Sequence, residues 1–231
     1  MKKVIFPLLL ACLPMALAAQ DCAAIYSYLK AGVTLEYTNY DKKGELQSVM
    51  THHVTRIEEQ ADTLIAWMEY TGTDKNGKTL YQNAAPIKCY QGVLYMDMRA
   101  LLPAQPNANQ SPDMTVEVEG TELTFPADMQ PGQELPNSEL TMTTRLGALQ
   151  IARMHYTITN RKVEARESVT TPAGTFACVK ISYDFEYKLL GTRTLHTEYW
   201  FSPEVGMVRS VSYDKKGKED SRMELTKVSK T

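Results

Sequence analysis

The sequence has 231 residues, of which 43% are hydrophobic and 23% charged, with a formal net charge of -2. Without residues 1–19 it retains 23 Lys and Arg against 27 Asp and Glu, a net charge of -4. The chain is mildly acidic and has no stripe of basic residues. Binding to nucleic acid or to an anionic membrane is therefore not indicated, because both require clustered Lys and Arg.

The N-terminus has the three parts of a secretory signal peptide. Two lysines follow Met1, an apolar run covers Val4–Ala19, and small residues stand where a signal peptidase would cut. We expect cleavage after Ala18 or Ala19, so that residues 1–19 are the signal peptide. Residues 20–231 would then form a single antiparallel β domain that works in the periplasm.

Two other interpretations of the N-terminus concern membrane attachment. A transmembrane helix needs roughly 20 apolar residues, whereas this run is shorter and is interrupted by Pro7 and Pro14. The segment Leu9–Cys12 loosely resembles a lipoprotein cleavage box, which would give an outer-membrane form anchored through Cys12. The apolar run continues to Leu17, where a lipidated cysteine is normally followed by a polar linker. The sequence therefore favours export without an anchor.

Three cysteines remain after the signal peptide, at positions 22, 89 and 178. In an oxidising compartment this count predicts one disulfide and one free thiol. We favour a Cys22–Cys89 disulfide, because it would tie a loose N-terminal segment to the body of the domain. Cys178 as one of the partners remains open.

Hydrophobic alternation with a period of two dominates the chain from Val33 to Val228. Val33, Leu35 and Tyr37 would face one side of a strand and their neighbours the other, which is typical of a half-buried strand. We expect short helices only at Ala23–Leu29 and Asp97–Leu102. Further alternating strands are predicted at Leu64–Thr71, Val93–Met98, Met154–Ile158, Ala177–Tyr187, Leu195–Phe201 and Met207–Tyr213.

Turn sequences recur between these segments. Tyr40–Gly44 and Tyr213–Gly217 have the same sequence, and Asp74–Gly77 is closely similar. Asp opens a type I turn by accepting backbone hydrogen bonds, and Gly adopts the left-handed conformation that follows. Each copy therefore predicts a hairpin tip. Residues 102–113 and 126–138, which are rich in proline, are expected to be connectors.

The candidate chemical groups form no recognisable site. His52 and His53 are adjacent and would point to opposite faces of a strand, so they cannot bind one ion together. His155 and His196 each share a strand face with too few other ligands for zinc. Nucleophile, phosphate-binding and dinucleotide motifs are absent from the sequence. The sequence therefore favours a protein that is not an enzyme, and it predicts no catalytic residue, metal or cofactor.

Two segments of the C-terminal third carry a family resemblance. Val169–Ile181 contains Thr-Pro-Ala-Gly-Thr-Phe-Ala-Cys-Val-Lys, and Glu198–Val208 is an aromatic strand ending in Val-Gly-Met-Val. Together they resemble the TapB-like group of exported bacterial proteins of unknown function. The resemblance implies Gram-negative export and an all-β, antiparallel, strongly curved sheet that forms a β-roll or open barrel, broadly similar to lipoprotein-carrier folds. It implies no catalytic residues.

Two functional hypotheses follow from these patterns. The first is a non-enzymatic periplasmic binding or carrier module, because a curved sheet presents a concave face to an apolar small molecule or lipid. The second is an envelope assembly protein that binds a protein partner through a sheet edge or loops. Candidates for the apolar ligand face are the strand residues Trp67, Met68, Met154, Tyr156, Tyr199 and Trp200, although alternation allows only half of the residues of each strand to face inward.

Overall fold

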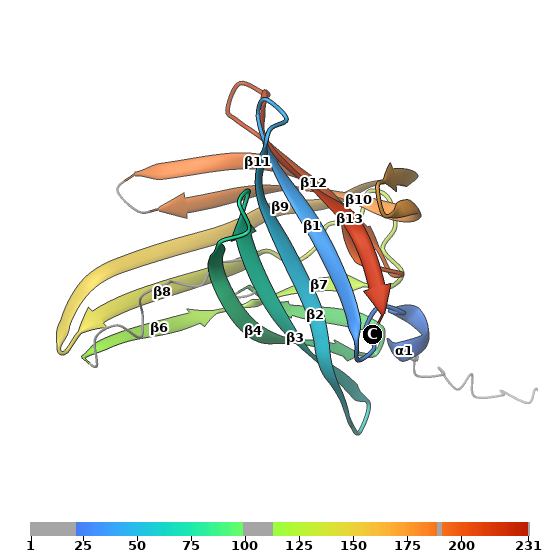
Figure 1. Ribbon diagram of the computed structural model, residues 1–231, viewed down its shortest axis with the longest axis horizontal. Coiled ribbons are helices and arrows are strands. Elements are labelled where there is room, and N and C mark those ends of the chain that lie inside the picture. Colours follow the sequence, from blue (N-terminus) through green and yellow to red (C-terminus); the bar gives the residue numbers. More distant parts are fainter. Residues whose placement is uncertain (1–21, 99–112, 189–190, 231) are drawn as a thin grey trace, which may run out of the picture.

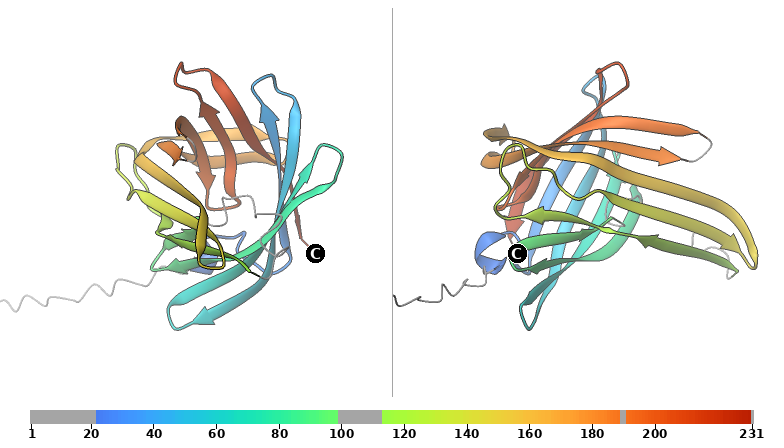
Figure 2. Two further views of the ribbon diagram at one scale, coloured as in Figure 1. Left: turned by 90° about the vertical axis from the view of Figure 1, so that its left-hand side faces the viewer. Right: turned by 180° about the vertical axis from the view of Figure 1, so that it is seen from behind.

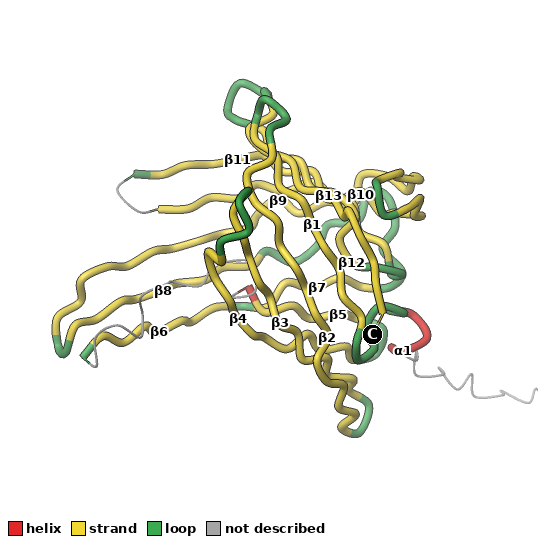
Figure 3. Tube along the Cα trace, viewed as in Figure 1, coloured by secondary structure: helices red, strands yellow, loops and turns green. Residues whose placement is uncertain are grey.

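The computed structural model describes residues 22–98, 113–188 and 191–230. In these ranges one short helix precedes thirteen strands (Figure 3). The elements are α1 (Cys22–Ile25), β1 (Val33–Asp41), β2 (Leu46–Gln60), β3 (Thr63–Asp74), β4 (Thr79–Tyr90), β5 (Val93–Asp97), β6 (Met114–Gly120), β7 (Glu122–Pro126), β8 (Ser138–Leu146), β9 (Leu149–Thr171), β10 (Gly174–Lys188), β11 (Thr192–Ser202), β12 (Gly206–Tyr213) and β13 (Glu219–Lys230).

All thirteen strands form one antiparallel sheet in the order β6-β8-β9-β10-β11-β12-β13-β1-β2-β3-β4-β5-β7. The sheet curls until its two ends, β6 and β7, approach each other, so that the molecule is a nearly closed barrel (Figures 1 and 2). The prediction of an all-β antiparallel fold is confirmed. The predicted signal peptide and Cys12 lie outside the described residues, as does most of the candidate helix at 97–102.

Three hairpin tips are built in the same way. Asp41 Oδ1 accepts hydrogen bonds from the backbone N–H groups of Lys43 (2.8 Å) and Glu45 (3.0 Å). Asp74 and Asp214 make the equivalent two bonds in the β3–β4 and β12–β13 turns. The glycine that closes each turn has a positive φ, between 71° and 82°, which explains the repeated sequence. The predicted hairpin tips are therefore confirmed.

Helix α1 closes one end of the barrel. A disulfide joins Cys22 to Cys89 at the end of β4, with 5.9 Å between their Cα atoms. The Tyr26 hydroxyl donates hydrogen bonds to the carbonyl oxygens of Gly92 (3.1 Å) and Phe125 (2.9 Å). The chain entering the barrel is thus fastened covalently and by buried hydrogen bonds, while Cys178 is a buried free thiol.

The connector at residues 126–138 crosses the seam between the two ends of the sheet. Its backbone bonds to β9, where Gly132 N donates to the Val163 carbonyl and Leu135 N donates to the Arg161 carbonyl. Leu135 and Met129 are buried. This proline-rich passage is therefore part of the packed barrel wall as well as a connection between strands.

The strands β6, β8 and β9 form an arm that extends to the left in Figure 1, beyond β1–β4. Strand β9 has 23 residues, of which Leu149–Ile158 pair with β8 and His155–Thr171 pair with β10. Because β9 belongs to both the arm and the barrel, the inner face of the arm continues the inner wall of the barrel.

Candidate functional site

A β-bulge in β9 places a charged residue inside the barrel. Ile158 and Arg161 both line the same internal cavity, although residues three apart on a regular strand face opposite sides. The register between β9 and β10 shifts between Ser182 and Asp184, and Asn160 has φ of 55°. One extra residue on β9 reverses the alternation and turns the side chain of Arg161 inward.

Arg161 is only 2% exposed. Its two terminal nitrogens each donate a 2.8 Å hydrogen bond, to the carbonyl oxygens of Pro136 and Thr124. The guanidinium carbon lies 5.2 Å from the centre of the Phe125 ring. Burial lowers the pKa of Arg161 to about 10, so the side chain is a cation at neutral pH. Among the described residues no carboxylate forms an ion pair with it.

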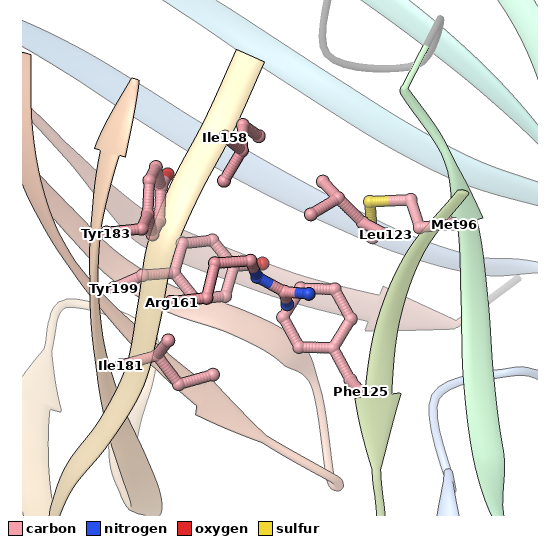
Figure 4. A pocket seen from close by; sticks show the side chains of 8 residues that line it. All are labelled: Met96, Leu123, Phe125, Ile158, Arg161, Ile181, Tyr183 and Tyr199. Atoms are coloured by element: carbon pink, nitrogen blue, oxygen red, sulfur yellow. The ribbon is translucent and has the colours of Figure 1, made fainter. Parts of the chain in front are cut away.

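The cavity beside this guanidinium has a volume of about 30 Å³ and a mainly apolar lining (Figure 4). Because one water needs roughly 10–15 Å³ by the same kind of measure, the space suits a group of two or three heavy atoms and is too small for an alkyl chain. The cavity is lined by Met96, Leu123, Phe125, Ile158, Arg161, Ile181, Tyr183 and Tyr199.

An apolar stripe runs from this cavity along the inner face of the arm. In the β8–β9 register Leu140 lies opposite Tyr156, and Met142 lies opposite Met154. Residues directly opposite one another share a face of the sheet, and Ile158 identifies that face as the inner one. A register shift between Thr144 and Arg145 places Leu149 opposite Leu146 on the same face, and the pair Thr144 and Ala152 lies between these leucines and Met154. We call the apolar residues of this face the inner-wall stripe, which consists of Leu140, Met142, Leu146, Leu149, Met154, Tyr156 and Ile158.

Exposure increases steadily along the inner-wall stripe. Ile158 at the cavity is 2% exposed, whereas Leu146 and Leu149, which face each other at the end of the arm, are 44% and 65% exposed. Strand β10 adds aromatic rings beside the stripe, with Phe185 6.1 Å from Tyr156 between ring centroids. The stripe therefore runs, from one residue to the next, from the wall of the cavity to two exposed leucines at the end of the arm.

A second group of aromatic rings lies on the adjacent strands β1, β2 and β3. The His52 imidazole sits between Tyr37 and Tyr70, with centroid separations of 4.7 and 4.6 Å. Burial lowers the pKa of His52 to about 3, so the ring is neutral at physiological pH. Within the described chain, His52 Nε2 and the Tyr70 hydroxyl are buried without a hydrogen-bond partner.

The six residues predicted to form one apolar face divide between the two sides of the sheet. Tyr199 lines the cavity, Met154 and Tyr156 belong to the inner-wall stripe, and Met68 is buried in the core. Trp67 and Trp200 lie on the outer face of the sheet, where Trp200 is nevertheless buried.

Both tryptophans neighbour an inward residue on a strand, so alternation turns them outward. The guanidinium of Arg56, an exposed residue, lies 4.9 Å from the centre of the Trp67 ring. Lys180 Nζ lies 5.1 Å from the Trp200 ring, and Trp200 Nε1 donates a hydrogen bond to Glu167. Trp67 and Trp200 thus pack beneath charged side chains of the outer surface and do not line the interior.

The other three histidines bond to neighbours on adjacent strands. His53 contacts Thr34, and His155 contacts Thr141, at 2.8 and 3.0 Å between Nδ1 and the hydroxyl oxygen. His196 Nδ1 lies 3.0 Å from Asp184. In the ranges that the structure describes, no three His, Cys, Asp or Glu side chains are placed to hold a metal ion. No described helix is long and apolar enough to span a membrane.

Comparison with known proteins gives the family. A model described as DUF3108-like matches residues 30–225. The chain belongs to the DUF3108-like family. A comparison with curated protein sequences found no match.

Two solved structures share the fold of this family member. A protein described as exported, with a YmcC-like fold, from Bacteroides fragilis has a TM-score of 0.73 and 24% identity, covering 87% of this chain and 97% of its own. A protein described as a lipoprotein from Parabacteroides distasonis gives the same TM-score and identity, covering 87% and 96%. These likenesses show that the chain shares its fold with the two proteins. The TapB-like designation stays a prediction.

Proposed function

We propose that this DUF3108-like protein is a non-enzymatic binding or carrier module of the periplasm that holds an apolar ligand along the inner-wall stripe. The observation that carries the proposal is the course of the stripe along one face of β8 and β9, from Ile158 at 2% exposure to Leu149 at 65%, with one interruption at the pair Thr144 and Ala152. Binding sites for small molecules are typically concave and apolar with a few polar groups. The stripe and the Arg161 cavity have this composition.

The energetic argument concerns the exposed end of the stripe. Fully burying a leucine side chain stabilises a complex by about 1.5–3 kcal/mol relative to leaving it in water. Leu146 and Leu149 are the most exposed residues of the stripe and lie opposite each other. A ligand that covers both regains part of that free energy, while its inner end reaches side chains that are already dry.

Export and the signal peptide at residues 1–19 belong to the same proposal. A periplasmic carrier must cross the inner membrane, and the N-terminal pattern of basic, apolar and small residues supports this route. Mass spectrometry of the mature N-terminus checks it, with a chain starting at position 19 or 20 expected. A diacylated Cys12 would overturn the proposal of an unanchored protein.

The binding proposal is tested with a fluorescent polyene C18 alcohol, which has the chain of a lipid and no charge. We expect saturable binding to the wild type, and about tenfold weaker binding to Leu146→Lys, since about 1.4 kcal/mol of apolar contact is lost. Thr143→Lys is the matched control, because Thr143 lies on β8 at a position of the opposite face. Absence of saturable binding to the wild type, or equal effects of the two substitutions, would contradict the proposal.

A second candidate function is supported by the position of β6. This strand is the last of the described sheet on its side, and it pairs with β8. An edge strand can accept a strand of a protein partner. A photo-crosslinking residue replacing Thr115 on β6 should then capture a discrete envelope protein in cells, whereas one replacing the exposed Glu69 of β3, which is paired on both sides, should not. Equal labelling at both positions would contradict this alternative.

A further inference from the structure

We infer that the ligand of the inner-wall stripe is an aliphatic monocarboxylate, whose carboxylate occupies the cavity and binds the guanidinium of Arg161. This inference rests on the proposed function and names the chemical class of its ligand. It follows from three properties of the cavity: an uncompensated charge, a small volume and an apolar path that starts at its wall.

The first property is the charge. Buried Arg residues are normally paired, because an isolated charge in a protein interior is costly. Arg161 bonds to the carbonyl oxygens of Pro136 and Thr124, which satisfy two donors and supply no negative charge. A guanidinium has five N–H donors, so three remain for an anion. A carboxylate is the planar partner that this fork binds best.

The second property is the size and polarity of the cavity. A volume of about 30 Å³ accommodates a carboxylate and excludes larger head groups such as sugars. Phe125, Ile158 and Leu123 surround the charged group (Figure 4). In such a dry environment the attraction between a guanidinium and a carboxylate is much stronger than in water.

The titratable groups at the cavity do not compete with the anion. Tyr183 of β10 and Tyr199 of β11 line it together with Arg161 of β9. Burial is the first cause that raises the pKa of both hydroxyls, that of Tyr183 to about 12. Both tyrosines are therefore neutral near pH 7, and the residues from β5 and β7 at the cavity are Met96, Leu123 and Phe125, which carry no charge.

The third property is the direction of the apolar path. Ile158 belongs to the cavity wall and is also the inner end of the inner-wall stripe. From there Tyr156 and Met154 continue along β9. A chain attached to a carboxylate at Arg161 would follow these side chains toward Leu149, and it would displace the groups that now cover Tyr156, which is only 8% exposed. A single unbranched chain requires the smallest displacement along this row of side chains.

Arg161 also has a structural role, because its hydrogen bonds cross the barrel seam. The test must separate that role from ligand binding. It compares a polyene C18 fatty acid with the alcohol of the same chain on the same protein, so that only the head group differs. The variant Arg161→Gln retains an amide donor for one carbonyl and removes the charge, and its alcohol affinity reports whether the apolar path is intact.

We expect the wild type to bind the acid at least about tenfold more tightly than the alcohol at pH 7.5. Arg161→Gln should lose the preference for the acid over the alcohol. Equal binding of acid and alcohol to the wild type would overturn the carboxylate inference and leave the proposed function standing. Binding of neither probe would contradict both.

A measurement on the wild type alone keeps the inference testable if Arg161→Gln does not fold. The acid is labelled with ¹³C at its carboxyl carbon and titrated in the complex by NMR. A guanidinium within hydrogen-bond distance favours the ionised form, so the bound carboxyl should titrate at lower pH than the same acid in solution. A bound carboxyl that titrates at a higher pH would place it away from Arg161 and overturn the assignment.

Discussion

Arg161 donates a 2.8 Å hydrogen bond to the carbonyl oxygen of Thr124, and this bond joins β9 to β7 across the seam of the barrel. Strand β7 ends the sheet order on one side, and β9 is third from the other end. A buried cation therefore links the two ends of a sheet that backbone ladder pairing leaves open.

Removing this link should destabilise the fold. Arg161→Met leaves the carbonyl oxygens of Pro136 and Thr124 buried without their donors, at about 1–3 kcal/mol each, partly offset because a buried charge is also removed. We expect the free energy of unfolding in urea to fall by about 2–4 kcal/mol. Arg145→Met, which breaks the exposed 3.3 Å pair with Glu117, should cost under about 1 kcal/mol. Equal losses in the two variants would refute the seam role.

The Cys22–Cys89 disulfide should contribute strongly to stability. It closes a loop with a sequence separation of 67, for which the chain-entropy model gives about 4 kcal/mol. The double variant Cys22→Ser, Cys89→Ser should lose about that amount in urea unfolding, and reductant should no longer affect it. Cys178→Ala is the control and should keep the sensitivity to reductant. A wild type unaffected by full reduction would contradict the prediction.

His52 should make stability depend on pH. Its folded pKa, about 3, is depressed by burial, whereas an unfolded histidine has a pKa near 6.5. The unfolded state therefore binds more protons below pH 6.5, and stability falls as the pH decreases. Between pH 7 and pH 5 this group should remove about 2 kcal/mol.

The substitution His52→Phe retains a ring between Tyr37 and Tyr70 and should flatten that part of the pH profile. Tyr70→Phe is the matched control. Burial raises the pKa of Tyr70, so its loss should leave the slope between pH 7 and pH 5 unchanged. An identical slope in the wild type and His52→Phe would show that His52 is not buried as a neutral ring.

The three aspartates at the hairpin tips should make the stability of the fold depend on pH in the acid range. Backbone N–H groups are the first cause that lowers the pKa of Asp41, Asp74 and Asp214. A carboxyl with a depressed folded pKa contributes stability above its unfolded pKa, about 3.9, and loses it as the pH falls through the folded value. Replacing all three by Ala should lower the melting temperature at pH 7, and the difference should shrink below pH 4. A constant difference down to pH 2 would contradict this account; Asn at the three sites should retain most of the stability.

The strands and turns of this fold were predictable because they depend on local patterns. Alternation from Val33 onward and the Asp-Lys-x-Gly turns each specify a conformation within a few residues. The strong curvature of the sheet was predicted only from the family resemblance of the C-terminal third. Strand lengths were less accessible: β9 has 23 residues, and the alternation at Met154–Ile158 identified only its middle.

The interior site was not predictable for a physical reason. Under strict alternation Arg161 and Ile158 face opposite sides, and only the bulge at Asn160 brings them together. The partners of Arg161 lie on segments that meet at the seam, which no local pattern encodes. The signal that could have indicated it is Asn160 beside Arg161, since Asn tolerates a positive φ. Trp67 is adjacent to Met68, and Trp200 to Tyr199, so strand alternation allows only one residue of each pair to face inward.

Native mass spectrometry of the protein purified from the envelope of its own cells tests the central claim most directly. The account predicts a population heavier than the mature chain by one aliphatic monocarboxylic acid, which organic extraction releases and the C18 acid displaces. A single apo mass, together with no binding of either C18 probe by the wild type, would contradict the claim that the inner wall is a ligand site.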